Sequence, residues 1–326
     1  MTRRILVTGG LGYIGGRLCS ALAADSALGV MATSRAAPDR APVWLGNCAL
    51  RSLDLLGATD DLQEACRGVA CVVHLAQTND VDSARDPATA LRVNGIGTLA
   101  LLRAAIQEKV GRFVYLSTAQ VYCAPLAGRI TEETLPRPVH PYAISHRTAE
   151  DFVLAAHDRR EIEGVVIRLS NGTGCPAAIN VDAWRLIGND LCRQVVETGR
   201  IVLKSAGLQW RDFIGLADVV AGIGYLMCLS AQQLDNGLFN LGGGHSLRII
   251  DFAETVAERA EVMFGRRPQI ERQNPTSSER HPILDYRIDK LIRTGFQPCG
   301  SLKDEIDRTL ELCRRHFSTG REQPAQ

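Results

Sequence analysis

Three glycines at fixed spacing form the clearest candidate site in the sequence. Gly9, Gly12 and Gly15 recur every third residue, directly after the apolar run at residues 5–7 and before an amphipathic stretch. The first glycine permits a tight turn, the second lets a pyrophosphate approach the backbone, and the third lets a helix pack closely on a strand. Unpaired N–H groups at the start of that helix attract anions. The spacing therefore predicts a dinucleotide-binding turn.

The end of the second apolar run indicates which coenzyme that turn would hold. A carboxylate there accepts a hydrogen bond from a ribose 2′-hydroxyl and favours NAD, whereas a cation favours the 2′-phosphate of NADP. Here the position carries Ser34 and Arg35, and the next carboxylate is Asp39. NADP is therefore preferred over NAD, unless Arg35 stacks on adenine or faces solvent. Asp54, which precedes Leu55, either holds the adenine edge or caps a helix.

The elements that must position this turn follow from the hydrophobic periodicity. The pattern predicts helices at residues 14–24, 94–108 and 141–156 and strands at residues 5–7, 30–33, 70–75, 112–116 and 164–169. Because strands alternate with helices, they form a parallel sheet with right-handed crossovers. The predicted fold class is α/β, a doubly wound parallel sheet of the Rossmann type.

The rhythm changes after about Ser170. Helices are expected at residues 180–199, 250–264 and 302–317, a short strand at 201–203, and two returns to the sheet edge at 212–214 and 237–241. This organisation predicts a dinucleotide-binding domain over residues 1–170 with returns at about 211–241. A smaller C-terminal α+β substrate-binding region would comprise residues 171–210 and 242–317, followed by a flexible tail at 318–326.

The bulk composition narrows the classes of partner. The 326 residues carry a formal net charge of +1 and are 45% hydrophobic, so neither nucleic acid nor a membrane is an expected partner. Because a strand-like run begins at residue 5, no secretory signal is expected in these first residues. The ten cysteines form no CxxC pair and no zinc spacing, which favours free thiols in a reducing cytoplasm and no metal site.

Two further segments carry side chains suited to proton transfer. Residues 114–122 contain Ser117 and Thr118, and residues 141–150 begin Pro-Tyr, with the tyrosine at position 142. Together with the glycine turn, they resemble the extended short-chain dehydrogenase/reductase family, in its NAD(P)-dependent nucleotide-sugar epimerase/dehydratase branch. The resemblance spans almost the whole chain, with further ordered landmarks at residues 74–76, 94–98, 168–171, 211–214 and 218–219.

The resemblance implies roles for these residues. Tyr142 would exchange a proton with the sugar oxygen while hydride moves at the adjacent carbon, which requires a pKa well below the usual value of about 10. Thr118 would hydrogen-bond the same oxygen, with Ser117 as second choice, unless its hydroxyl merely satisfies the backbone at a strand end. The implied coenzyme contacts are Gly9, Gly12, Tyr13, Ile14, Gly15, Ser34, Arg35, Asp54, Leu55, Leu75, Ala76, Asn94, Tyr142 and His146.

Position 146 departs from the family pattern. The family places a lysine four residues after the tyrosine, where it binds the nicotinamide ribose and lowers the tyrosine pKa, whereas this chain has His146. The spacing puts both side chains on one helix face. An imidazole is mostly neutral at pH 7 and would lower the pKa of Tyr142 less, unless it is held protonated. Three interpretations follow: His146 is a working substitute, a nearby cation such as Arg147 contributes, or catalysis is weak or lost.

The resemblance also implies residues that bind a nucleotide-sugar substrate. Asn171 matches an asparagine that contacts a phosphate, Arg211 an arginine that contacts diphosphate or ribose, and Arg280, in poorer register, a second phosphate-binding arginine. An arginine fork suits phosphate because it binds in a bidentate manner. The alternative for Arg211 is an ion pair with Asp212 or Asp218.

The leading hypothesis is NADPH-dependent reduction of a keto group, at C4, on a nucleotide-activated sugar. A nucleotide-sugar 4-epimerase that uses NAD is the alternative within the family. Family dehydratases carry an acid/base pair of Asp and Glu after the serine or threonine, where this chain has Ala119 and Gln120. The alternative from another class is a coenzyme-binding protein with little or no turnover. A homodimer through a four-helix bundle, built from residues 94–108 and 141–156, is also expected from the resemblance.

Overall fold

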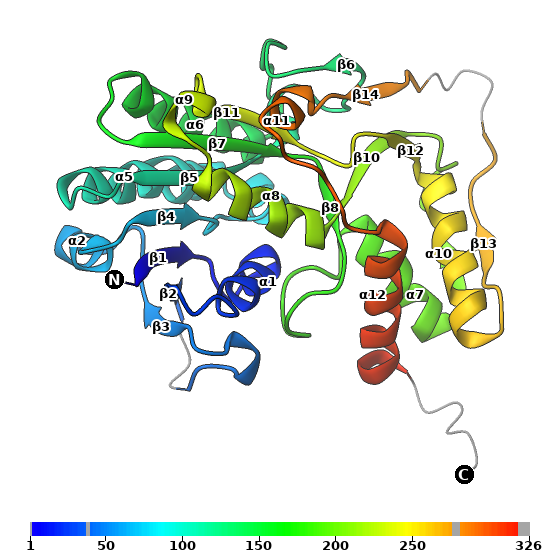
Figure 1. Ribbon diagram of the computed structural model, residues 1–326. Coiled ribbons are helices and arrows are strands. Elements are labelled where there is room, and N and C mark those ends of the chain that lie inside the picture. Colours follow the sequence, from blue (N-terminus) through cyan, green and yellow to red (C-terminus); the bar gives the residue numbers. More distant parts are fainter. Residues whose placement is uncertain (1, 37–39, 276–280, 319–326) are drawn as a thin grey trace.

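The main sheet is parallel throughout, as the sequence predicts. The computed structural model describes residues 2–36, 40–275 and 281–318 (Figure 1). Among them, seven strands pair in the order β3–β2–β1–β4–β5–β7–β11. Their bounds are β1 (Arg3–Thr8), β2 (Leu28–Ser34), β3 (Ala49–Ser52), β4 (Cys71–His74), β5 (Arg112–Thr118), β7 (Glu163–Leu169) and β11 (Leu238–Leu241). This is the doubly wound Rossmann order, and the predicted fold class is confirmed.

Successive side chains of the strands enter two separate cores. In β4, Cys71 and Val73 join the core on one face of the sheet, whereas Val72 joins the core on the other. In β5, Val114 and Tyr115 divide in the same way. The alternation follows from the two-residue period of a strand. Because helices cover both faces, these strands are apolar at nearly every position.

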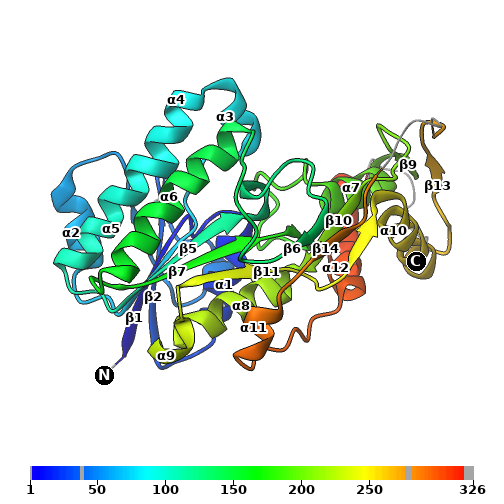
Figure 2. The ribbon, with the colours of Figure 1, turned by 90° about the horizontal axis from the view of Figure 1, so that it is seen from above.

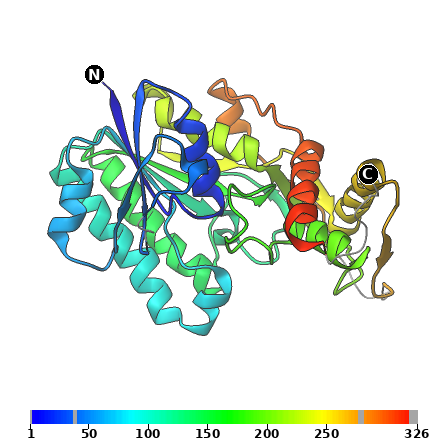
Figure 3. The same cartoon turned by 90° about the horizontal axis from the view of Figure 1, so that it is seen from below.

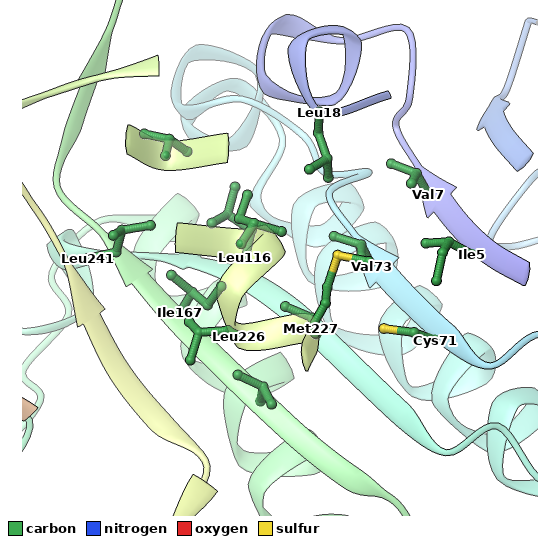
Figure 4. Close-up of a cluster of buried hydrophobic side chains, with 14 of the residues drawn as sticks. Ile5, Val7, Leu18, Cys71, Val73, Leu116, Ile167, Leu226, Met227 and Leu241 are labelled. Atoms are coloured by element: carbon green, nitrogen blue, oxygen red, sulfur yellow. The ribbon is translucent and has the colours of Figure 1, made fainter. Parts of the chain in front are cut away.

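Helices cover both faces of the main sheet. One face carries α1 (Tyr13–Leu22) and α8 (Leu216–Cys228), and the other carries α2 (Thr59–Cys66), α5 (Thr98–Gln107) and α6 (Pro141–Asp158) (Figure 2). In Figure 4, Leu18 of α1 and Met227 of α8 approach Val73 of the sheet, and Leu226 of α8 lies beside Ile167. The predicted helix at 94–108 begins as a π-helix, η2 (Leu91–Gly97), and continues as α5.

A second region lies beyond the carboxyl ends of the main strands (Figures 1 and 3). Three of its helices share one apolar core: α7 (Ile187–Thr198), α10 (Ile249–Phe264) and α12 (Leu302–Phe317). Three small sheets accompany it: β8 (Asn171–Thr173) with β10 (Trp210–Gly215) and β12 (Ser246–Arg248), β9 (Arg200–Val202) with β13 (Gln269–Glu271), and β6 (Gly128–Ile130) with β14 (Leu284–Tyr286).

The remaining helices are short and lie in connections. They are η1 (Val43–Leu45), α3 (Asp80–Arg85), α4 (Pro87–Ala90), η3 (Ala119–Val121), α9 (Ala231–Leu234) and α11 (Asp289–Arg293). No helix within the described ranges is long and apolar enough to cross a membrane. All ten cysteines are free thiols.

Two predicted elements need correction. The helix expected at residues 180–199 begins only at Ile187, because residues 181–186 form turns in which Trp184 Nε1 donates to the Ile179 carbonyl oxygen at 2.8 Å. Residues 212–214 do not return to the main sheet; β10 pairs with β8 and β12 instead. A short apolar run predicts a strand but carries no information about its pairing partner. The return at 237–241 is confirmed as edge strand β11. Of the predicted tail, residues 319–326 lie outside the described residues.

Candidate active site

Two adjoining cavities open at the carboxyl ends of β1 and β4. The strand order reverses direction between these two strands, which is where ligands bind in sheets of this kind. One cavity has a volume of about 430 Å³ and reaches Thr118 and Tyr142. The other, of about 670 Å³, reaches Asp54 and Leu55. Because Gly9, Gly12, Arg35, Leu75 and others line both, the two cavities form one long cleft.

The glycine turn lies at the middle of this cleft. Gly9 has φ +67°, and a Cβ there would lie 2.9 Å from the Ala76 backbone nitrogen. A Cβ on Gly15 would lie 2.1 Å from the Gly9 carbonyl oxygen, so the close approach of helix and turn requires glycine. Helix α1 has Gly12 as its N-cap, no side-chain cap and no acidic residue in its first turn. Its first N–H groups are therefore available to an anion.

Tyr13 and Ile14 follow in the first turn of α1 and also line the cleft. The Tyr13 hydroxyl points away from it, since it donates to the Gly174 carbonyl oxygen at 3.0 Å. What Tyr13 offers a ligand in the cleft is therefore its backbone N–H.

The second cavity gathers the residues expected around the adenosine end of a coenzyme. Ser34, Arg35, Asp54, Leu55, Leu75 and Ala76 all line it. Arg35 is exposed and forms no ion pair with any described residue. Asp54 does not cap α2, which begins at Thr59. Its Oδ1 accepts from the Leu56 backbone N–H at 3.0 Å, which closes a turn at the cavity wall.

Thr118 and Tyr142 face each other at the far end of the cleft. Thr118 is the last residue of β5, and Tyr142 lies in the first turn of α6, where the His140 side chain caps the Tyr142 N–H at 3.2 Å. Thr118 Oγ1 accepts from the Gln120 N–H at 3.2 Å and also bonds the Tyr142 side chain. Burial, followed by the Asp80 carboxylate, raises the pKa of Tyr142 to about 12 against the lowering effects of Thr118 and Arg185, so the lowered tyrosine pKa expected for this role is not found.

Ser117 lines the same cavity, but its hydroxyl already has a partner. It donates to Glu150 Oε1 at 2.5 Å. Glu150 is held in turn by Arg168, whose Nη2 lies 2.7 Å from Glu150 Oε2, and both side chains are buried. Ser117 therefore supports the strand end rather than competing with Thr118 for a ligand.

His146 lies behind Tyr142 rather than at the cleft surface. Its side chain is fully buried and lines neither cavity. Its Nδ1 is 3.0 Å from the Tyr115 hydroxyl, and its ring meets the Tyr142 ring edge-on with centroids 4.3 Å apart. Burial lowers the pKa of His146 to about 3. The histidine is therefore neutral, which overturns the idea that it is held protonated.

Arg147 does not supply the missing cation either. Its Nη2 lies 2.6 Å from Asp151 Oδ1 on the outer side of α6. The groups that shift the pKa of Tyr142 are Asp80, Thr118 and Arg185, besides burial, and Arg147 is not among them.

Asn94 has a different place from the one the resemblance implies. It is fully buried in the π-helix and lines neither cavity. Its Oδ1 accepts from the Thr78 N–H and its Nδ2 donates to Ser145 Oγ, both at 2.9 Å. It thus joins the cleft loop after β4 to the helix that carries Tyr142, as a positioning residue.

The cleft also includes residues that the sequence reasoning missed. Gln77, Thr78, Asn79 and Asp82 line it, together with Asp182 from the turn before α7. Asn79 Nδ2 donates to Asp182 Oδ2 at 2.8 Å, so the two segments meet across the opening. The position of residues 77–79 directly after a parallel strand next to the switch point could have identified them.

Two of the three substrate candidates, Asn171 and Arg211, do not line the cleft. Asn171 Nδ2 donates to the Asp212 carbonyl oxygen at 2.9 Å. Arg211 forms no ion pair with a described carboxylate, and burial lowers its pKa. The ion pair of Arg211 with Asp212 or Asp218, which was the alternative, is therefore wrong. Asp212 Oδ1 instead accepts from Ser170 at 2.5 Å, and Asp218 Oδ1 accepts from the Gly300 N–H at 2.7 Å. Arg280 lies outside the described residues.

Known proteins resemble this chain over nearly its whole length. Residues 5–242 match the NAD dependent epimerase/dehydratase family. A dTDP-glucose 4,6-dehydratase of Streptomyces griseus is 28% identical over 98% of this chain and 96% of its own length. A GDP-6-deoxy-D-mannose reductase of Pseudomonas aeruginosa is 31% identical over 80% of this chain and 82% of its own. The solved structure of RMD from Pseudomonas aeruginosa complexed with NADPH, 24% identical, covers 97% of this chain and 98% of its own with a TM-score of 0.76.

Proposed function

The chain belongs to the NAD dependent epimerase/dehydratase family, and on that premise we propose that it uses NADPH to reduce the C4 keto group of a nucleotide-activated sugar. The observation that carries the proposal is the pair of hydroxyls of Thr118 and Tyr142, which meet at one end of a cleft whose middle is the glycine turn. The GDP-6-deoxy-D-mannose reductase among the relatives supports a reduction.

The cleft fits a nicotinamide dinucleotide. The pyrophosphate would lie against the glycine turn and the uncapped start of α1, where backbone N–H groups and the helix dipole favour negative charge. Arg35 has no partner among the described carboxylates and, with Ser34, lines the cavity at the adenosine end. A guanidinium and a hydroxyl suit a 2′-phosphate, which supports NADP over NAD.

The proton transfer follows from the state of Tyr142. The coenzyme, when bound, supplies the hydride. Because burial raises the pKa of Tyr142 to about 12, its phenol stays protonated at neutral pH and serves as a proton donor. It gives that proton to the carbonyl oxygen, which Thr118 also hydrogen-bonds, so that the carbonyl becomes a secondary alcohol. The resulting phenolate is strongly basic and takes its proton back from solvent.

Dehydration fits this site less well than reduction. Elimination of water from a sugar needs a second acid and base near the hydroxyl-bearing strand end. The two residues that follow Thr118 are Ala119 and Gln120, in the turn η3. Neither side chain can donate or accept a proton in that role.

The substrate would reach the cleft from the second region. We propose that Asn171, Arg211 and Arg280 contact its diphosphate. The lack of a described carboxylate partner for Arg211 supports this, because a half-buried guanidinium without a counter-ion is a good phosphate ligand.

A second candidate function rests on His146. A neutral, buried imidazole leaves Tyr142 without the neighbouring cation that would tune its pKa. The chain would then bind coenzyme and substrate with weak turnover or none.

One experiment separates these functions. Purified protein is mixed with NADPH and nucleoside diphosphate 4-keto-6-deoxy sugars that carry different bases, and the loss of NADPH absorbance is followed, with Tyr142→Phe as the control. Consumption of NADPH by the wild type supports the reductase, whereas stoichiometric NAD(H) that co-purifies with the protein indicates the epimerase. Coenzyme binding without consumption indicates the second candidate, and failure to bind NADPH or NADH contradicts both proposals.

A further inference from the structure

A buried polar pair lies directly behind the proton donor of the site. Tyr115 in β5 and His146 in α6 have no exposed surface, and the Tyr115 hydroxyl lies 3.0 Å from His146 Nδ1. His74 also packs near the Tyr115 ring, at 5.7 Å between centroids. Both nitrogens of His74 are taken by Thr8 and Thr98, at 2.6 and 2.9 Å, so it does not compete for the Tyr115 hydroxyl.

The hydrogen bond between Tyr115 and His146 can run in either of two directions. In one, the Tyr115 O–H donates to Nδ1, and His146 carries its own proton on Nε2. In the other, an Nδ1–H donates to the Tyr115 oxygen. The second arrangement leaves the Tyr115 O–H with no acceptor among the described residues and the Nε2 lone pair with no donor. The first leaves one donor, Nε2–H, unpaired. Since each unpaired buried polar group is destabilising, the first arrangement is favoured.

We infer that Tyr115 is a positioning residue whose hydroxyl fixes the tautomer of His146, so that Nε2 presents an N–H. The sequence pattern gives no sign of this, because Tyr115 lies in an apolar strand run that the fold buries completely.

The free N–H of His146 is placed beside the candidate active site. His146 follows Tyr142 by one helical turn, and the two rings are in edge contact at 4.3 Å between centroids. Its Nε2 is buried without a partner among the described residues. Because Nε2 has no exposed surface, a ribose hydroxyl of the nicotinamide coenzyme would accept this hydrogen bond only if the side chains around His146 move when the coenzyme binds, a step that rests on the proposed function. A neutral imidazole can then replace only the directional part of a lysine's role, not its charge.

Nitrogen NMR of the coenzyme-free, full-length protein tests the inference directly. The chain is labelled with ¹⁵N-histidine, and His146→Gln assigns the His146 signals among the seven histidines. Protonated and unprotonated ring nitrogens of a neutral histidine resonate far apart, so the spectrum reports the tautomer. Tyr115→Phe removes the hydroxyl and keeps the ring. The matched control is Tyr122→Phe, at another buried tyrosine, whose hydroxyl donates to Asn240 at 2.7 Å.

We expect the wild type and Tyr122→Phe to carry the His146 proton on Nε2, and Tyr115→Phe to show a shift toward the Nδ1–H form. The dissociation constant of NADPH should rise about fivefold in Tyr115→Phe, the usual effect of one lost hydrogen bond. A proton on Nδ1 in the wild type overturns the inference, as does an unchanged tautomer in Tyr115→Phe.

Two other results remain decisive. If Tyr115→Phe does not fold, as judged by circular dichroism, the wild-type tautomer alone decides. If the wild type binds neither NADPH nor NADH, the proposed function fails while the tautomer result still stands.

Discussion

At the scale of single residues, a neutral imidazole occupies the place where this family has a lysine. His146 is buried against Tyr142, and burial lowers the pKa of the histidine to about 3 while it raises that of the tyrosine to about 12. A phenol with such a pKa stays protonated at neutral pH and becomes a base only in strong alkali. The protonated state of Tyr142 thus favours the reductive direction of the reaction, in which this residue starts as an acid.

The pH dependence of reduction follows from these pKa values. Because Tyr142 donates as the protonated phenol, kcat/KM should stay level through neutral pH and fall only as the pH approaches about 12. In His146→Lys, a nearby cation would lower the pKa of Tyr142, so the alkaline fall should begin at lower pH. Steady-state rates from about pH 6 to about pH 11 should therefore stay level for the wild type and fall at the alkaline end for His146→Lys. An alkaline fall near neutral pH in the wild type contradicts the assignment of Tyr142 as the acid.

Removal of the phenol hydroxyl should abolish most of the chemistry. Tyr142→Phe is expected to lower kcat by about 10²–10⁴-fold, the usual contribution of a positioned acid. The dissociation constant of NADPH should change little, as measured by fluorescence titration. Tyr122→Phe is the control, since its hydroxyl lies in a separate buried cluster with Asn240. Equal losses in both variants would indicate a folding defect instead.

The coenzyme preference is expected to depend on Arg35. Arg35→Asp replaces the cation at the adenosine end with a charge that repels a 2′-phosphate, so NADPH binding should weaken by about tenfold or more. NADH, which lacks that phosphate, should bind as well as before or better. Titration of both coenzymes against Arg35→Asp and wild type decides this. A similar loss for both would place Arg35 elsewhere on the coenzyme.

At the scale of elements, one carboxylate attaches the last helix to the glycine-turn helix. Glu305 of α12 is 1% exposed, and its Oε1 lies 2.7 Å from Arg17 Nη2 of α1. It also accepts from the backbone N–H groups of Cys175 and Ala217, both at 3.1 Å. The second region is thereby tied to the main sheet directly beside the candidate coenzyme turn.

Loss of this carboxylate should destabilise the whole chain. Glu305→Ala leaves the partly buried Arg17 and two N–H groups without their acceptor, and we expect a loss of about 3–5 kcal/mol in the free energy of unfolding. Urea denaturation measures it. Glu311→Ala on the exposed side of the same helix serves as control. Its surface pairs with Arg314 and Arg315 should contribute at most about 1 kcal/mol. Similar values for the two variants would argue against Glu305 as the attachment point.

At the scale of the whole molecule, the outer face of the α5–α6 layer carries exposed apolar side chains. Leu91 is 43% exposed, Ile96 51% and Ile144 46%. They come from the π-helix and from α6, which lie side by side (Figure 2). The groove between α5 and α6 adds Leu99 and Phe152. Apolar side chains gathered on one helical face are typical of a subunit interface.

We propose that this face forms a homodimer of two helix pairs. Ile96→Arg or Ile144→Arg would place a charge in the buried interface and should convert the dimer to monomer, as measured by sedimentation equilibrium. Val262→Arg, at a 66% exposed position on α10 in the second region, is the matched control and should stay dimeric. A monomeric wild type would contradict the proposal.

Much of the fold was predictable because its signals are local. The strand runs, the glycine spacing and the helices of the first half depend on residues within one or two turns of each other, and each of these appears in the structure. The same locality explains the failures. Strand β10 could pair with the main sheet or with β8, and nothing in residues 210–215 distinguishes the two outcomes.

The sequence by itself determined the parallel sheet, the glycine turn and part of the cleft lining, Thr118 and Tyr142 included. Only the tertiary structure decided the protonation states and hydrogen-bond partners of the site residues. His146 is neutral because β5 buries it against Tyr115, 31 residues away, and Ser117 is engaged by Glu150, 33 residues away. Burial and hydrogen-bond partners depend on neighbours distant in sequence. For that reason, residue type and spacing show where chemistry can occur, and packing decides in which protonation state.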